Sequence, residues 1–280
     1  MSPCLEREYD MVAFFATPFG RFLILYGALY AGFGVQSAYL PTLLDSRNLA
    51  PEAIAVVLAA GAAIRLAAGP AGGRLADRLD APKTVLAVCS AAAALIALGY
   101  VSAHGLALLF VVGVLHSASL APLAPLSDTL ALGTAAPARC DDTVQRRFHY
   151  GWLRGAGSAA FICGTLLSGQ AIGRFGITAA VWLNAGLLAA TAFAARLVPV
   201  LLPPEDAAPP ATGERTVGGF GALLRLPLYR RVVLVAALIL GSHAMHDSFA
   251  AIRWEAAGIG PGIVGVLWSF SVAAEVTCAA

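Results

Sequence analysis

Eight runs of mainly apolar residues restrict the fold of this chain more than any other feature of its sequence. They cover approximately residues 21–44, 53–73, 84–103, 106–132, 150–172, 177–201, 228–254 and 262–280. A helix needs about 20 such residues to cross the hydrocarbon core of a bilayer. Because lipid offers no hydrogen bonds, each run must satisfy its backbone groups internally, which a helix does. The sequence therefore predicts an all-α membrane protein.

The composition agrees with this class and excludes several others. Only 12% of the 280 residues are charged, 59% are hydrophobic and the formal net charge is +2, whereas soluble domains contain roughly 25% charged residues. An ordinary soluble enzyme, a disordered chain and a nucleic-acid-binding protein with a basic patch are excluded. The five cysteines are widely spaced and form no CxxC pair, so neither a disulfide framework nor a zinc ribbon is indicated. No metal and no cofactor is predicted. The lipid bilayer is an expected partner, and nucleic acid is not.

The connections between the runs differ in their content of basic residues. The second, fourth and sixth connections, counted with Arg196, Arg230 and Arg231 at the ends of the flanking runs, hold eleven Lys and Arg residues, and the four odd-numbered connections, counted with Arg253, hold three. Positively charged flanks stay on the cytoplasmic side of a membrane. This pattern predicts that the N-terminal segment, residues 1–20, and the even-numbered connections are cytoplasmic.

One connection, residues 202–227, is long, polar and rich in proline and glycine, which predicts a cytoplasmic linker. It separates six runs, within residues 21–201, from two runs, within residues 228–280. The last run ends without a charged flank or a polar tail. We therefore expect the chain to be truncated or to be a fragment of a longer protein.

A short charged motif follows the second run. Residues 73–78 read GRLADR and are followed by Lys83. With the layout of six runs, a linker and a second set, this segment resembles the GxxxDRxGRR/K motif of the major facilitator superfamily. It departs from the motif at Asp80, where glycine is usual, and at Ala81, where a basic residue is usual. The resemblance implies a conformational gate, with a solvated turn as the alternative; the gate residues are Gly73, Asp77, Arg78 and Lys83.

Two further stretches carry a more specific resemblance. Residues 150–162 read YGWLRGAGSAAFI, which is similar to the YGxxRxxGSxxFI opening of helix five in the phenylpropionate-transporter branch, a relative of lactose permease. Residues 242–276 resemble helices seven and eight of the same branch. The resemblance covers essentially the whole chain. It implies a six-helix N-terminal bundle plus the first two helices of a second bundle, in the bacterial cytoplasmic membrane.

Ionisable residues inside the runs are functional candidates, because a charge within a bilayer is costly. Asp128 and Arg154 lie at a similar distance from the cytoplasmic side, so they can pair. The planar fork of an arginine fits a carboxylate, whether that of Asp128 or that of a bound organic acid. The resemblance implies that this pair contacts substrate. The alternative interpretation is a static ion pair between two helices.

Two more residues are candidates for contact with substrate. Phe161 lies seven residues after Arg154, where the resemblance implies an aromatic that stacks on the substrate. The alternative to substrate contact is that this helix face, which carries small residues, packs closely against another helix. Arg65 lies nine residues before Arg74, so it either lines a cavity or extends toward the cytoplasmic interface.

The candidates for a coupled proton lie in the last two runs. His243 and Glu275 are both near the middle of their runs. The pKa of a histidine lies near pH 7, and burial away from water raises the pKa of a carboxyl group toward pH 7. The resemblance supports Glu275 as a proton-binding residue, because lactose permease has a glutamate in the corresponding helix. Asp247 shares a helix face with His243 and is a weaker candidate.

These residues predict a secondary transporter, not an enzyme. The favoured function is proton-coupled symport of a small organic anion such as an aromatic carboxylate, because buried arginines compensate a negative charge. The partners would be this small molecule and a proton. Alternatives are a sugar or nucleoside symporter and a non-transporting remnant of such a carrier. A metal-dependent membrane enzyme is disfavoured, because the sequence has no HExxH motif and only one histidine cluster.

Overall fold

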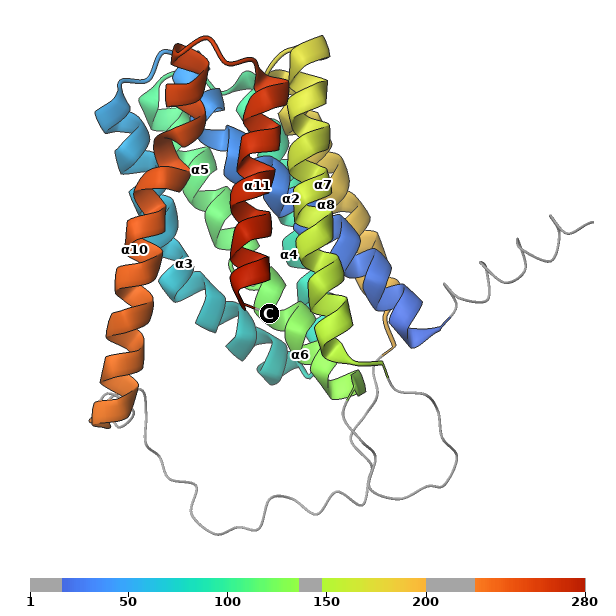
Figure 1. The fold of residues 1–280 in the computed structure, drawn as a ribbon. Helices are drawn as coiled ribbons and strands as arrows, with labels where there is room; N and C mark the ends of the chain where they lie inside the picture. Colours follow the sequence, from blue (N-terminus) through green and yellow to red (C-terminus); the bar gives the residue numbers. More distant parts are fainter. Residues whose placement is uncertain (1–16, 136–147, 200–224, 280) are drawn as a thin grey trace, which may run out of the picture.

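The computed structural model describes residues 17–135, 148–199 and 225–279, and these form helices without strands (Figure 1). The helices are α2 (Pro18–Ser46), α3 (Pro51–Leu79), α4 (Pro82–Ser102), α5 (Leu106–Leu120), α6 (Leu123–Ala135), α7 (Tyr150–Phe175), α8 (Thr178–Leu197), α10 (Pro227–Ala256) and α11 (Pro261–Ala279). Within the described residues, seven spans are long and apolar enough to cross a membrane, with α5 and α6 counted together, and part of α11 is a shorter apolar helix. The predicted all-α membrane fold is confirmed. The predicted linker falls mostly outside the described residues, so the division at residues 202–227 stays a prediction.

Prolines mark where several helices begin. Five of the described helices, α2, α3, α4, α10 and α11, begin with proline. Proline suits the first turn of a helix because a backbone N–H at that position has no partner within the helix, so the absence of the N–H costs no hydrogen bond. At α2 the hydroxyl of Thr17 also accepts a hydrogen bond from the backbone N–H of Gly20 at 3.1 Å. The local sequence therefore fixes the start of these helices.

A proline also interrupts the fourth span. Helix α5 ends at Leu120 and α6 begins at Leu123, with Ala121 and Pro122 between them. Pro122 has no backbone N–H to donate to the preceding turn, which breaks the helical hydrogen-bond ladder. The break divides the span into two shorter helices, α5 and α6.

Helix α2 lies at the centre of the fold and packs mainly against α7 and α8. Small residues make its contact with α7 close. A Cβ atom added at Gly164 of α7 would collide with the backbone of Ala31, and one added at Gly34 of α2 would collide with the carbonyl of Phe161. Without a hydrophobic force between helices in lipid, such close backbone approach is a main source of helix association.

Helices α10 and α11 join the bundle in different ways. Helix α11 packs along α7, and the hydroxyl of Tyr39 donates a hydrogen bond to the carbonyl of Pro261 at 2.9 Å. Helix α10 contacts α2 through its C-terminal half, where Ala250 and Ala251 are buried. Its N-terminal half, residues 228–239, is almost entirely exposed and diverges from the other helices in Figure 1.

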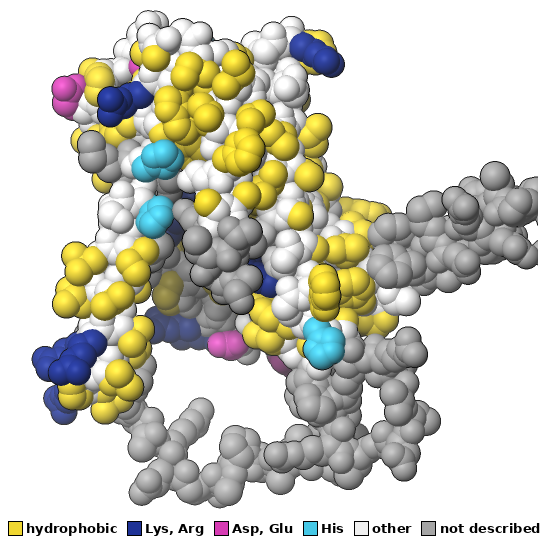
Figure 2. Space-filling view, in the orientation of Figure 1, with side chains coloured by type: hydrophobic (Ala, Val, Ile, Leu, Met, Phe, Trp, Pro, Cys, Tyr) yellow, Lys and Arg dark blue, Asp and Glu magenta, His cyan; other side chains and the backbone are white. Residues whose placement is uncertain are grey.

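The outer surface of the helices is suited to lipid. Thirty large hydrophobic side chains are exposed, spread over the described helices, whereas a soluble monomer rarely exposes such large contiguous apolar areas. Figure 2 shows hydrophobic side chains over the sides of the molecule and Lys and Arg side chains mainly near its ends and beside α10. This distribution matches a protein whose sides face hydrocarbon.

The turn between α3 and α4 forms although Asp80 replaces the usual glycine. Asp80 adopts a left-handed conformation with φ of 47°, and its N–H donates to the carbonyl of Asp77. The N–H of Ala81 donates to the carbonyl of Ala76, which completes the helix cap. Aspartate tolerates this conformation better than most residues, but glycine adopts it without a Cβ penalty.

We expect Asp80→Gly to stabilise the protein by about 0.5–1 kcal/mol, because relief of the left-handed strain exceeds the added entropy of the unfolded chain. Asp77→Gly is the matched control, since Asp77 is helical and exposed. It should change stability by less than about 0.5 kcal/mol, because the lower helix propensity of glycine is offset by the loss of an acidic side chain from the last turn of the helix. The measurement is unfolding in mixed micelles followed by circular dichroism. A loss of stability in Asp80→Gly would show that the Asp80 side chain has a stabilising role of its own.

Candidate functional site

Two tyrosines on α2 lie at the centre of the candidate site. Tyr26 and Tyr30 are four residues apart, so the helix places them on one face. Both are buried, and their ring centroids are 5.4 Å apart. A buried tyrosine hydroxyl requires a hydrogen-bond partner, above all in a membrane-spanning segment. Here the partners are Asp128 and Arg154, which the sequence had already selected.

Asp128 lies on α6, and the hydroxyl of Tyr26 donates a hydrogen bond to its Oδ1 at 2.5 Å. Tyr150, the first residue of α7, interacts electrostatically with Asp128. A carboxylate accepts several hydrogen bonds, and each donor offsets part of the cost of removing it from water. The carboxylate of Asp128 is therefore held by the hydroxyl of Tyr26, with Tyr150 as a further polar neighbour.

Arg154 lies on α7, one turn beyond Tyr150. Its Nη1 donates a hydrogen bond to the hydroxyl of Tyr30, and its guanidinium carbon lies 4.7 Å from the centroid of the Tyr30 ring. The second contact is a cation–π interaction. A guanidinium has five N–H donors, and Arg154 is exposed. Donors therefore remain for a ligand.

The structure differs from the expected direct pair of Asp128 and Arg154. Among the residues that the structure describes, the two charges are connected through Tyr26 and Tyr30 and form no ion pair with each other. They do lie at the similar depth that the sequence predicted, since their partners are one helical turn apart on α2. The charge of Arg154 thus has a neutral hydroxyl and a ring as its immediate partners.

Sequence analysis did not select Tyr26 and Tyr30 as site residues. A signal was present, because two tyrosines at a spacing of four within an apolar run place two hydroxyls on one face of a membrane helix. Such hydroxyls need polar partners. The sequence did not show which helix would supply these partners.

The face of α7 beyond Arg154 serves helix packing. Thr165 and Ser168 are fully buried, and the Thr165 hydroxyl donates to the carbonyl of Gly34 at 3.1 Å. The alternative interpretation, that the small residues on this face allow close packing, is the one that the structure supports. Phe161 is half-buried and packs against the hydrophobic core. Its contact with a substrate stays a prediction.

Arg65 lies on α3 and is exposed. It interacts electrostatically with Tyr100 of α4 and His116 of α5. Arg65 is thus on the side of the bundle where α3 packs against α5, and it is not part of the group formed by Tyr26, Asp128 and Arg154. The two arginines proposed for substrate binding lie in separate surroundings.

The predicted gate residues surround the turn between α3 and α4. Asp77 and Arg78 are exposed, and they form no side-chain ion pair with any described residue. A Cβ atom added at Gly73 would meet open space, whereas one added at Gly72 would collide with Pro122 at the break in the fourth span. Close packing therefore involves Gly72, not Gly73. Lys83 is half-buried near the start of α4, and a gating role for these residues stays a prediction.

The predicted proton-binding residues lie in α10 and α11. His243 is exposed, and its Nδ1 lies 2.8 Å from the carbonyl oxygen of Ile239 on the same helix. The side chains of Asp247 and Glu275 lie outside the part of the chain that the structure describes. His246 stacks on Trp268 with ring centroids 5.6 Å apart, so it packs as an aromatic residue. Proton binding by His243, Asp247 and Glu275 stays a prediction.

Comparisons with known proteins agree with this architecture. The family model described as "MFS_1 like family" matches residues 21–279. The chain is also 29% identical over 263 residues to a protein of Escherichia coli (strain K12) named "Probable 3-phenylpropionic acid transporter". That alignment covers 91% of this chain and 65% of the relative, so the chain spans just under two thirds of the relative's length.

The resemblance found in the motifs at residues 73–83 and 150–162 is thereby confirmed. The match extends over nearly all of the described helices, and seven of the spans are long and apolar enough to cross a bilayer. The chain is an integral membrane protein and belongs to the MFS_1 like family of the major facilitator superfamily.

Proposed function

We propose that the protein is a secondary active transporter that carries a small organic anion, such as an aromatic carboxylate, together with a proton. The observation that carries this proposal is the surroundings of Arg154. Its guanidinium contacts the neutral Tyr30, while the carboxylate of Asp128 is bound by the hydroxyl of Tyr26. A carboxylate on a ligand is the partner that the remaining N–H donors of Arg154 fit.

The surroundings of Asp128 favour an anion over a sugar or nucleoside. A ligand rich in hydroxyl groups needs acceptors as well as donors, and one oxygen of Asp128 already accepts a hydrogen bond from Tyr26 at 2.5 Å, whereas an anion needs donors alone. The name of the 29% identical relative supports an aromatic acid as the first compound to test. We infer 3-phenylpropionate or a similar acid as substrate.

Proton coupling is assigned to Glu275, with His243 as a relay. In the family to which this chain belongs, sites near the bilayer midplane alternate between the two sides as the two halves move. A carboxyl group at that depth binds a proton when its surroundings are dry and releases it when they are wet. The proposed orientation has the N-terminus and the 202–227 linker in the cytoplasm of a bacterium.

Uptake of 3-phenylpropionate into proteoliposomes tests this proposal. A pH gradient, alkaline inside, should drive accumulation, and a protonophore should abolish it. Glu275→Gln mimics the protonated carboxyl group and should keep exchange of labelled for unlabelled substrate while losing accumulation. Binding without uptake would contradict the transport function, and normal accumulation by Glu275→Gln would remove Glu275 from the coupling mechanism.

A further inference from the structure

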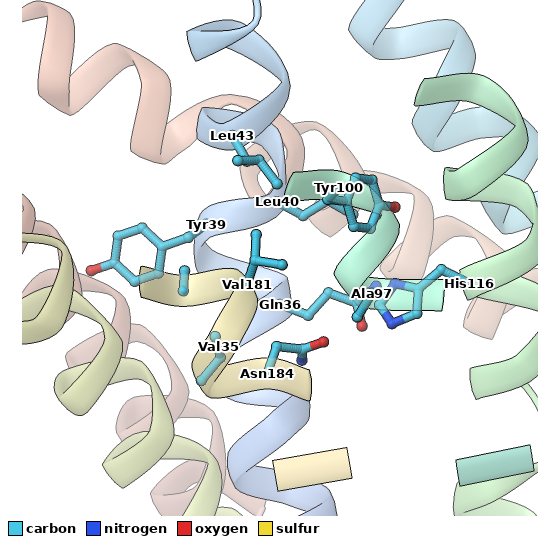
Figure 3. Close-up of a pocket in the computed structure, with 11 residues that line it drawn as sticks. Val35, Gln36, Tyr39, Leu40, Leu43, Ala97, Tyr100, His116, Val181 and Asn184 are labelled. Atoms are coloured by element: carbon cyan, nitrogen blue, oxygen red, sulfur yellow. The ribbon is translucent and has the colours of Figure 1, made fainter. Parts of the chain in front are cut away.

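A pocket lies between α2, α4, α5 and α8, away from the Arg154 site (Figure 3). Its walls are mainly apolar, and five side chains with polar groups line it: Gln36, Tyr39, Tyr100, His116 and Asn184. Figure 3 shows the ring of His116 extending from α5 toward Ala97 and Gln36. His116 is only 1% exposed.

His116 lacks partners in a place where a polar group needs them. Within the described residues, neither ring nitrogen of His116 has a hydrogen-bond partner, and the buried hydroxyl of Tyr100 has none either. The two rings pack edge to face with centroids 5.7 Å apart. Buried polar groups are nearly always satisfied by protein or by ordered water. Ordered water at the ring of His116 and the hydroxyl of Tyr100 would satisfy both groups and would also give protons a route to the ring.

The charged and titratable groups around His116 come from neighbouring helices. Arg65 of α3 interacts electrostatically with both His116 and Tyr100. Tyr100 belongs to α4, and Tyr39 of α2 also lines the pocket. Asn184 of α8 is polar but does not titrate. Arg65 is therefore the charged neighbour that matters for a proton on His116.

Arg65 links this buried ring to the exterior of the bundle, because Arg65 is itself exposed. A protonated His116 would place a second positive charge near Arg65, which Coulomb repulsion disfavours. An anion bound at Arg65 would offset that repulsion. Proton and anion would then favour each other's binding by the same factor, as linkage requires.

We propose that Arg65 and His116 form a coupling unit, in which an organic anion at Arg65 promotes protonation of the buried His116 ring. This inference rests on the proposed function, adds Arg65 to it as a second anion contact apart from Arg154, and adds a proton-binding residue in the fourth span. His243, the histidine that the sequence favoured, already has its Nδ1 at a carbonyl of its own helix. His116 offers both ring nitrogens.

The test is a pH titration of histidine side chains by NMR. The 280-residue chain is labelled with ¹⁵N-histidine in lipid nanodiscs, at constant ionic strength, with and without 3-phenylpropionate, benzoate or acetate. We expect at least one of these anions to raise the pH of half-protonation of His116 by one unit or more.

Variants separate coupling from a structural role. Arg65→Gln should abolish the anion-dependent change at His116, and Arg65→Lys should retain it. His116→Gln identifies the resonance; if this variant does not fold, Tyr100→Phe identifies it by perturbing the adjacent ring. In the uptake assay, His116→Gln should keep the exchange of labelled for unlabelled substrate. Its accumulation of substrate driven by a pH gradient should fall at least tenfold.

The outcomes distinguish this inference from the proposed transport function. An unchanged His116 titration with all three anions overturns the coupling unit, whether or not the protein transports. Uptake of 3-phenylpropionate with an unchanged titration leaves the transport function standing and the coupling unit wrong. An anion-dependent titration that requires Arg65 supports the unit even if no uptake is measured.

Discussion

Arg154→Lys should lower the affinity of the protein for 3-phenylpropionate about 10- to 100-fold. Lysine keeps the positive charge but lacks the planar fork that holds Tyr30 and a carboxylate at the same time. A hydrogen bond to a charged group contributes about 1.5–3 kcal/mol, and each 1.4 kcal/mol is about a factor of ten in affinity. Equilibrium binding to the purified protein in nanodiscs measures the effect.

Two variants serve as controls for this result. Arg21→Lys changes an arginine at the end of α2 whose Nη1 donates to the carbonyl of Leu197 at 3.2 Å, and it should leave affinity unchanged. Tyr30→Phe keeps the ring beneath Arg154 and removes the hydroxyl, so it should weaken binding less than Arg154→Lys. Equal affinity of the Arg154→Lys variant and the unaltered protein would show that Arg154 does not bind substrate and serves only as a contact between α2 and α7.

Gly164→Ala should destabilise the protein by about 2–3 kcal/mol, near the upper end of the usual cost of overpacking. The added Cβ atom would collide with the carbonyl and Cα of Ala31. These are backbone atoms of a helix, so they cannot rotate away as a side chain can. Helices α2 and α7 would have to separate, which also disturbs the hydrogen bond between Thr165 and Gly34. Unfolding by SDS in mixed micelles measures the loss.

Gly155→Ala is the matched control on the same helix. Gly155 is exposed, and a Cβ atom added there would meet nothing within 4 Å. Alanine is the better helix former by about 0.8–1 kcal/mol, so this variant should be slightly more stable than the unaltered protein. The two substitutions are chemically identical and should act in opposite directions. Equal effects would show that helix propensity, and not the contact between α2 and α7, decides the result.

Much of the fold could be predicted from the sequence because spanning a bilayer is a local requirement. The described helices match the predicted runs closely; α7, for example, was expected over residues 150–172 and extends from Tyr150 to Phe175. Prolines at residues 51, 82, 227 and 261 mark helix starts for a reason that lies within a single residue. The similar depth of Asp128 and Arg154 also followed from counting residues along two helices.

The contacts of the site could not be predicted in the same way. Tyr26 and Tyr30 separate the charges of Asp128 and Arg154, and Gly72 rather than Gly73 approaches Pro122. His116 is one of several titratable residues within the apolar runs, and the packing of α5 against α3 and α4 is what leaves it buried beside Arg65 and Tyr100.

The sequence by itself determined the number, extent and apolar character of the spans, because the free energy of placing a residue in lipid depends mainly on that residue. Only the tertiary structure decided how each helix is rotated and which neighbours it meets. A helix that is apolar all round has no polar face to indicate its rotation. In lipid that rotation is set by close packing at positions such as Gly34 and Gly164 and by paired polar groups such as Tyr26 and Asp128, which lie 102 positions apart in the chain.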